Sequence, residues 1–182
     1  DMRVLDPACG SGTFLVMAVT DPTRRSKGIS AFIVDGKTRG IGVGKAEPKM
    51  GQRASHTCPV VFDACKIPAE NLLGEEGAGI KIARSALDSG RIGIASLSTG
   101  IIAACLEEMT KYAKQRTAFG KPIADFQAVQ WMIADTAVEY ECARGLSVLT
   151  AWRKQAGEAF TEKAAIAKLY ATEAANRAAY RA

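Results

Sequence analysis

Two charged residues near the middle of the chain, Asp88 and Arg91, have the types and the spacing for ligand chemistry. They are three residues apart in a segment with helical periodicity, so both side chains face the same groove. A guanidinium group beside a carboxylate can anchor a polar ligand, because its planar fork donates hydrogen bonds in fixed directions. The alternative is an ion pair on a solvated helix face, which contributes about 0.2–0.5 kcal/mol.

A second set of candidates surrounds the turn at residues 118–122, which reads AFGKP. Arg116 precedes the turn, Phe119 lies within it, and Gln127 follows it at the start of the next helical segment. An arginine at the end of one helix, next to the free amides of the following helix, suits a diphosphate group. Phe119 and Gln127 are placed to pack and hydrogen-bond nearby. The alternative is a buried loop aromatic flanked by an arginine and a glutamine on helix surfaces.

A glycine-rich string at residues 3–14, RVLDPACGSGTF, resembles the cofactor loop of the adenine-N6 DNA methyltransferases. In those enzymes a glycine turn after a strand lets the backbone approach S-adenosylmethionine, and a helix follows the glycines. They also need a Pro-Pro-aromatic element that holds the flipped base. Here no two of the six prolines are adjacent, and residues 14–20 (FLVMAVT) have strand preferences. A methyltransferase fragment is therefore kept as an alternative function, with residues 1–12 as an orphan or foreign segment.

The remaining reactive side chains suggest neither a metal site nor a triad. His56 is the only histidine, so a histidine-based metal site or catalytic triad has no second member, and we predict no metal. The five cysteines form no CxxC pair, which favours a reducing compartment and cysteines that pack as small core residues.

The composition is that of a globular chain of 182 residues, with 48% hydrophobic and 24% charged residues. A net charge of +5 without any basic run favours anionic small molecules about as much as nucleic acid. No apolar stretch approaches the ~18 residues of a membrane span, and the chain begins without a signal-peptide pattern. We therefore expect a cytoplasmic protein without a membrane partner; we also predict no nucleic-acid partner, although the charge alone does not decide this.

The elements that must position these residues change type near residue 74. Before it, short β-branched runs alternate with turn residues, which predicts antiparallel strands of a sandwich or barrel. These runs are residues 14–21, 29–35, 41–45, 60–62 and 65–68. After it, apolar residues recur at helical spacing, which predicts helices over residues 78–116, from the turn to about 156, and from Thr161, the expected cap, onward. The fold class is therefore α+β: a partial antiparallel β-domain followed by three antiparallel helices of a bundle.

From about Thr13 to its end the sequence resembles the acyl-CoA dehydrogenase family. The matching strings occur in the family's order and at its spacing. They are MAVTD (17–21), KGISAFIV (27–34), KMGQR (49–53), IPAENLLG (67–74), LDSGRIGIA (87–95), RTAFGKP (116–122) and FQ (126–127). The resemblance implies part of a middle β-domain at residues 13–73 and part of a carboxy-terminal helical domain at residues 74–182.

The resemblance also implies an activity. In such enzymes a glutamate removes the α-proton of an acyl-CoA thioester while the β-hydrogen leaves as hydride to FAD. Asp88 and Arg91 match the family's acyl-CoA contacts, and Arg116, Phe119 and Gln127 match positions that contact the FAD of a neighbouring subunit. It further implies a homo-oligomer, usually a tetramer, an electron-transfer flavoprotein or similar acceptor, and a mitochondrial-matrix location in a eukaryote.

Some parts of the family pattern are not visible in this sequence. The usual catalytic glutamate is not recognisable, and the position before Arg91, where a minority of the family carries the base, is Gly90. The helical pattern of the last segment continues up to Ala182. We therefore expect an incomplete piece that is inactive by itself, with the catalytic residue unassigned. A non-catalytic helical assembly module is the third functional alternative.

Overall fold

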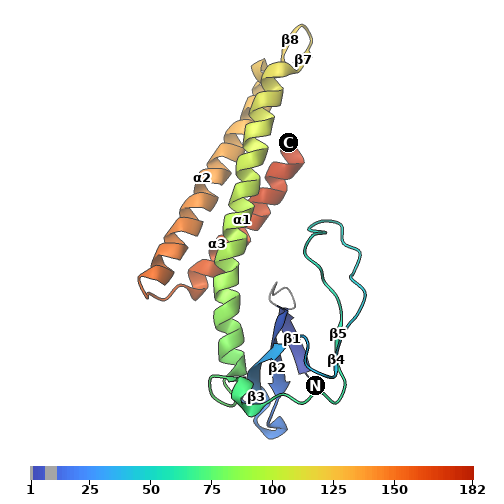
Figure 1. Ribbon diagram of the computed structural model, residues 1–182. Helices are drawn as coiled ribbons and strands as arrows, with labels where there is room; N and C mark the ends of the chain where they lie inside the picture. Colours follow the sequence, from blue (N-terminus) through green and yellow to red (C-terminus); the bar gives the residue numbers. More distant parts are fainter. Residues whose placement is uncertain (1, 7–11) are drawn as a thin grey trace. The chain divides into compact units, whose positions relative to one another are not determined.

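The computed structural model describes residues 2–6 and 12–182, and the side chains from residue 12 onward. The chain forms two compact units, residues 1–85 and 86–182, and the division falls within the long helix α1 (Gly79–Gln115). The first residues of α1 belong to the first unit, where Ala83 packs with Met17 and Ala31. Figure 1 labels the helices and most of the strands.

The first unit is built on a four-stranded antiparallel sheet in the order β1-β2-β3-β6. Its strands are β1 (Met2–Asp6), β2 (Thr13–Val19), β3 (Ile29–Asp35) and β6 (Leu72–Leu73). Val16 and Val34 are fully buried because alternate side chains of a strand point to the same face. The antiparallel strands predicted near residues 14–21 and 29–35 are therefore confirmed.

A hairpin of β4 (Ile41–Val43) and β5 (Val60–Phe62) completes the strand structure of this unit. Ile41, Val60 and Phe62 pack against a cluster that includes Phe14, Val16 and Val34 of the sheet, so the two small sheets share apolar contacts. The strand predicted at residues 65–68 is wrong. That segment is irregular and leads into a short 3-10 helix, Ala69–Asn71, whose N-cap is Pro68, a residue without an amide proton for a strand ladder.

A strand follows the glycine-rich string, as the strand preferences of residues 14–20 predict. β2 pairs antiparallel with β1, Arg3 opposite Met17, and with β3, Val16 opposite Phe32. The cofactor loop of a methyltransferase needs a helix where β2 lies. The string's residues 7–11 lie outside the described part of the chain.

The second unit consists of the remainder of α1 with α2 (Gln127–Gln155) and α3 (Thr161–Arg181). The ends of α1, the end of α2 and the start of α3 lie within about one residue of the predicted positions, whereas α2 begins at Gln127, a few residues after the turn, because a 3-10 helix at Ile123–Asp125 comes first. Their shared core is a row of buried alanines on α3, packed against Ala95 and Ile102 of α1 and Ala143 of α2. The row contains Ala164, Ala167, Ala171, Ala174, Ala175 and Ala178. Their spacing of three and four residues places them on one face, and small side chains let the helices approach closely.

One sequence expectation about α3, and most of the expectation about the cysteines of both units, are wrong. Phe160, not Thr161, is the N-cap of α3, and it provides no side-chain acceptor for the first turn. Cys142 is exposed and Cys58 and Cys65 are only half-buried, so these three cysteines are not core residues, whereas the half-buried Cys105 packs against the helical core as expected.

Helix α1 is also more apolar than the sequence reading implied. It contains an 18-residue window with a mean hydropathy of 1.4, of which 28% is buried, so its length and composition alone would allow a membrane span. The expectation that no apolar stretch approaches a span is therefore wrong. Alanine, isoleucine and leucine accumulate here because α1 has two apolar faces. Ala95, Ser98 and Ile102 are buried, whereas Leu87, Ile94, Leu97 and Ile101 are exposed.

We expect Ala171→Leu to lower the free energy of unfolding by about 1–3 kcal/mol, because the added methylenes have no space in the alanine row. Ala165→Leu is the matched control: Ala165 is exposed on the same helix, and the change should stay within about 0.5 kcal/mol. Urea unfolding followed by circular dichroism measures both. Equal losses in the two variants would contradict the packing described here.

Asp21 gives the first unit an expected pH dependence. The hydroxyl and amide of Thr23 donate to Asp21 Oδ1 at 2.6 and 2.9 Å, which lowers the pKa of this carboxyl below its ordinary 3.8. A lowered folded-state pKa contributes stability that is present above the unfolded pKa and is lost as pH falls through the folded one. Unfolding of wild type and Asp21→Asn between about pH 5 and pH 2 should show the wild-type advantage shrinking towards acid. A difference independent of pH would contradict it.

Candidate functional site

The Asp88–Arg91 pair forms as the sequence predicts. Arg91 Nη1 donates to Asp88 Oδ1 at 2.6 Å, and both residues lie on the same face of α1. The Asp88 side chain is 13% exposed, whereas that of Arg91 is 41% exposed. The Asp88 carboxylate is therefore largely withdrawn from water, unlike the carboxylate of an ion pair on a fully solvated face. The Arg91 side chain remains accessible to a ligand.

Two further residues contact α1 at this place, and neither contact was predicted: Thr161 was expected only as a helix cap, and Lys154 was not a candidate. Thr161 Oγ1, at the start of α3, donates to Asp88 Oδ2 at 2.6 Å. Lys154 Nζ, near the end of α2, donates to Ser89 Oγ at 2.9 Å. The pair thus lies where one end of each of α2 and α3 contacts α1. The partners are 73 and 65 residues away from their contacts in sequence, so local patterns could not reveal them.

The second candidate set lies at the connection between α1 and α2. The amide of Arg116 donates to Tyr112 O at 2.8 Å, and Arg116 O accepts from the Ile123 amide at 2.8 Å. Between these bonds the chain forms a hairpin of β7 (Thr117–Ala118) and β8 (Lys121–Pro122). Figure 1 shows this hairpin at one end of the helices. The backbone bonds thus fix the path of the chain from Arg116 to the hairpin and back.

Phe119 lies at the tip of this hairpin in an unusual conformation. Phe119 and Gly120 have φ angles of +53° and +79°, as a two-residue hairpin turn with two left-handed residues requires. Such a φ is uncommon for a residue with a side chain. The Phe119 side chain is 95% exposed, so the alternative of a buried loop aromatic is wrong.

The aromatic and basic side chains around the tip contact one another. The Phe119 ring meets Phe126 edge-on, with centroids 6.1 Å apart and planes at 84°. Lys121 Nζ lies 4.6 Å from the centre of the Phe126 ring, a cation–π contact. Phe126 is the N-cap of α2 and offers no side-chain acceptor, and Arg116 and Gln127 are exposed close by in sequence. Exposed cations beside an uncapped helix N-terminus fit an anionic group, and the exposed ring fits a planar one.

The structure groups the five predicted residues into two sets and keeps the sets apart. The part of α1 between Arg91 and Gln115 rises about 36 Å at ~1.5 Å per residue. Arg116, Phe119 and Gln127 therefore lie at the opposite end of this unit from Asp88 and Arg91. A single unit does not bring both sets to one reaction centre.

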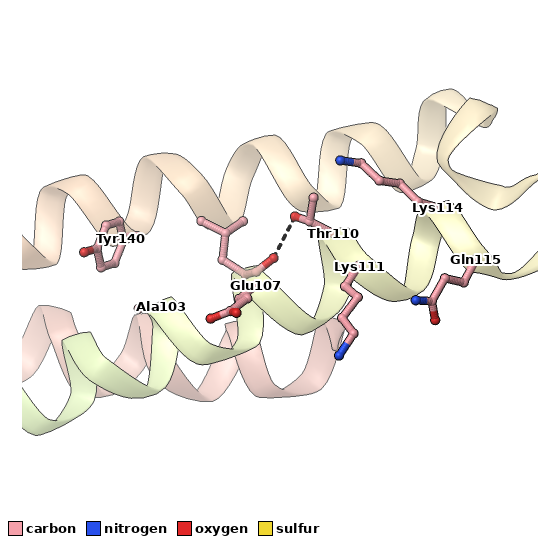
Figure 2. A pocket seen from close by; sticks show the side chains of 8 residues that line it. Ala103, Glu107, Thr110, Lys111, Lys114, Gln115 and Tyr140 are labelled. Atoms are coloured by element: carbon pink, nitrogen blue, oxygen red, sulfur yellow. Dashed lines mark hydrogen bonds between the residues drawn. The ribbon is translucent and has the colours of Figure 1, made fainter.

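A third feature, a groove of about 620 Å³, runs along α1 and reaches Tyr140 of α2. Figure 2 shows Glu107, Lys111, Lys114 and Gln115 along it, and the Thr110 hydroxyl donating to the Leu106 carbonyl at 2.7 Å. None of the predicted site residues lines it. Within the described part of the chain, no cluster of three or more His, Cys, Asp and Glu residues could hold a metal ion.

Comparisons with known proteins match most of the chain. The model of the family described as acyl-CoA dehydrogenase, C-terminal domain, matches residues 77–182. The short-chain specific acyl-CoA dehydrogenase of mouse mitochondria is 48% identical over 168 residues, which are 92% of this chain and 41% of the mouse protein. The chain thus spans about two fifths of the length of the curated relatives it matches.

Solved structures agree with these sequence matches. The butyryl-CoA dehydrogenase of Megasphaera elsdenii has a TM-score of 0.88 at 40% identity, covering 94% of this chain and 50% of that one. A chain in a structure titled for the electron transferring flavoprotein of Acidaminococcus fermentans has a TM-score of 0.90 at 41% identity, covering 96% and 46%. Because the model of the family's C-terminal domain matches more than half of the residues of this chain, the chain belongs to the acyl-CoA dehydrogenase family.

Proposed function

We propose that this chain is the part of a flavin-dependent acyl-CoA dehydrogenase that binds the polar portion of the thioester and a neighbouring subunit's FAD. The observation that supports this most is the Asp88–Arg91 pair. Its carboxylate is held by two donors at 2.6 Å, and its guanidinium is partly free, at the positions that match the family's acyl-CoA contacts. The similarity to short-chain specific and butyryl-CoA dehydrogenases favours a short acyl chain.

Each residue of the pair has a distinct part in this proposal. Arg91 donates hydrogen bonds to oxygen atoms of the thioester's polar chain, because its guanidinium has donors left after bonding Asp88. Asp88 orients Arg91 and offers carboxylate oxygens as acceptors. Together they fix the thioester along α1, so that binding energy holds the acyl end in place for reaction.

The second set, Arg116, Phe119 and Gln127, would hold FAD. Arg116 and the uncapped start of α2 suit its diphosphate, the exposed Phe119 ring suits packing, and Gln127 suits hydrogen bonding. FAD supplies the acceptor for the hydride that leaves the β-carbon while a base takes the α-proton. The two sets of residues are separated by about 36 Å along α1, which supports binding of the FAD of a neighbouring subunit by the second set, and hence a homo-oligomer.

The electron acceptor and the location belong to the same proposal. An electron-transfer flavoprotein is a suitable acceptor, since a structure titled for such a flavoprotein contains a chain that matches this one at 41% identity. The cytoplasm, or the mitochondrial matrix in a eukaryote, is the location that suits this chemistry, and one curated relative is named as mitochondrial.

A non-catalytic helical assembly module is the second candidate, and one observation favours it. Leu87, Ile94, Leu97 and Ile101 form an exposed apolar stripe on α1 at spacings of seven, three and four residues. Such a stripe suits association between helices. This candidate predicts oligomers that bind neither acyl-CoA nor FAD, whereas the enzyme binds both.

Replacing Arg91 should weaken thioester binding. In protein expressed from the complete reading frame that contains this chain, we expect Arg91→Gln to raise the Kd for butyryl-CoA about tenfold to a hundredfold, through the loss of charged hydrogen bonds. Arg144→Gln is the control, because Arg144 also pairs with an acid three residues away, Glu141 at 3.8 Å, on an exposed face. Titration calorimetry measures both. The proposal would be wrong if wild type did not bind butyryl-CoA, or if both variants weakened its binding equally.

Replacing Arg116 should weaken flavin retention. We expect Arg116→Gln protein to carry at most about half of the wild-type FAD after gel filtration, because a charged contact to the diphosphate is lost. The ratio of flavin absorbance to protein absorbance measures this. Lys111→Gln, which removes an exposed cation from the last turns of α1, the helix that ends just before Arg116, should leave the ratio unchanged. Full retention by Arg116→Gln would remove Arg116 from the flavin site.

A further inference from the structure

Thr161 contacts the Asp88–Arg91 pair at the carboxylate oxygen of Asp88 that Arg91 does not bond. Its hydroxyl donates to Asp88 Oδ2 at 2.6 Å, while Arg91 Nη1 donates to Asp88 Oδ1 at 2.6 Å. Each carboxylate oxygen therefore has its own donor, one from α3 and one from α1. Hydroxyl-to-carboxylate bonds of this length are of the stronger, charge-assisted kind.

The position of Thr161 reinforces this bond. It is the first residue of α3, whose N-cap Phe160 has no side-chain acceptor for the free amides of the first turn. The start of a helix carries a partial positive charge, which favours a carboxylate nearby. Asp88 thus supplies negative charge at the helix end where the cap itself supplies none.

The bond from Thr161 restricts how the Asp88 carboxylate can turn. The last torsion of an aspartate is broad and roughly two-fold, so a carboxylate held by one donor can rotate and take that donor with it. With donors on both oxygens the plane of the carboxylate is fixed, and so is the direction in which Arg91 presents its remaining N–H groups. The Arg91 side chain is 41% exposed, so its bond to Asp88 limits how the guanidinium can turn.

We propose that Thr161 is a positioning residue of the thioester site: it holds the Asp88 carboxylate, and through it Arg91, in the orientation that binds acyl-CoA. This inference rests on the proposed function of the pair. It concerns the Thr161 hydroxyl and not the attachment of α3, because the alanine row of α3 packs against α1 and α2 independently of that hydroxyl.

The test compares three changes in protein from the complete reading frame. Thr161→Val keeps the shape of the side chain and removes the hydroxyl, Thr161→Ser keeps the hydroxyl, and Thr172→Val is the control. Thr172 is on the same helix, and its hydroxyl donates within that helix, to the Lys168 and Leu169 carbonyls at 2.9 and 3.1 Å. Calorimetry gives the Kd for butyryl-CoA, and urea unfolding gives stability.

We expect Thr161→Val to raise the Kd about fivefold to tenfold, Thr161→Ser to stay within about twofold of wild type, and Thr172→Val to leave the Kd unchanged. In an Arg91→Gln background, Thr161→Val should cause a smaller loss of affinity than it does in wild type, because no guanidinium is left to orient. A merely structural role would lower stability but would give neither the rescue by serine nor this non-additivity.

The outcomes separate the two claims. If wild type binds butyryl-CoA and Thr161→Val binds it equally well, only the role of Thr161 is overturned. The same holds if Thr161→Ser is as weak as Thr161→Val, or if the losses in the Arg91→Gln background add. If wild type binds no thioester, the proposed function fails and the role of Thr161 fails with it.

Discussion

The row of small side chains on α3 is the constraint on which the helical unit depends. Ala167, Ala171, Ala174 and Ala178 are fully buried against α1 and α2, and larger residues there would push the helices apart. Close packing brings the first turn of α3 to α1, where the Thr161 hydroxyl reaches Asp88. The packing of the alanine row therefore positions the polar site. The alanines hold the helices together, and the ends of the helices supply the hydrogen-bond donors.

The connection between α1 and α2 shows a different way of fixing functional groups. A two-residue turn with φ positive at Phe119 and Gly120 reverses the chain, and the Arg116–Ile123 backbone bond closes the hairpin. A positive φ is energetically unfavourable for phenylalanine, and the Phe119 ring faces solvent instead of the core. This end and the Asp88 end are separated by the length of α1, which supports the proposal that a neighbouring copy completes the FAD site.

The sequence predicted local structure well and long-range contacts poorly. The helices and the main strands follow from periodicity and β-branched runs, and the Asp88–Arg91 pair follows from a spacing of three on a helix. Thr161 was predicted to cap its own helix because Thr favours that position, but α3 begins at Thr161 itself, with Phe160 as the N-cap, and the Thr161 hydroxyl donates to Asp88 of another helix. Phe119 was given a buried alternative because aromatic residues favour cores, whereas the hairpin geometry decided its exposure. The two apolar faces of α1 could not be ranked from sequence, since burial goes to the face that meets the alanine row.

The central claim is that the polar end of this helical unit binds acyl-CoA through Arg91 and Asp88. A crystal structure of the complete reading-frame protein with butyryl-CoA tests it most directly. We expect oxygen atoms of the thioester's polar chain within about 3.2 Å of an Arg91 guanidinium nitrogen, with the Asp88 carboxylate still bonded to Arg91. A thioester bound elsewhere, with Arg91 and Asp88 contacting only solvent or each other, would contradict it.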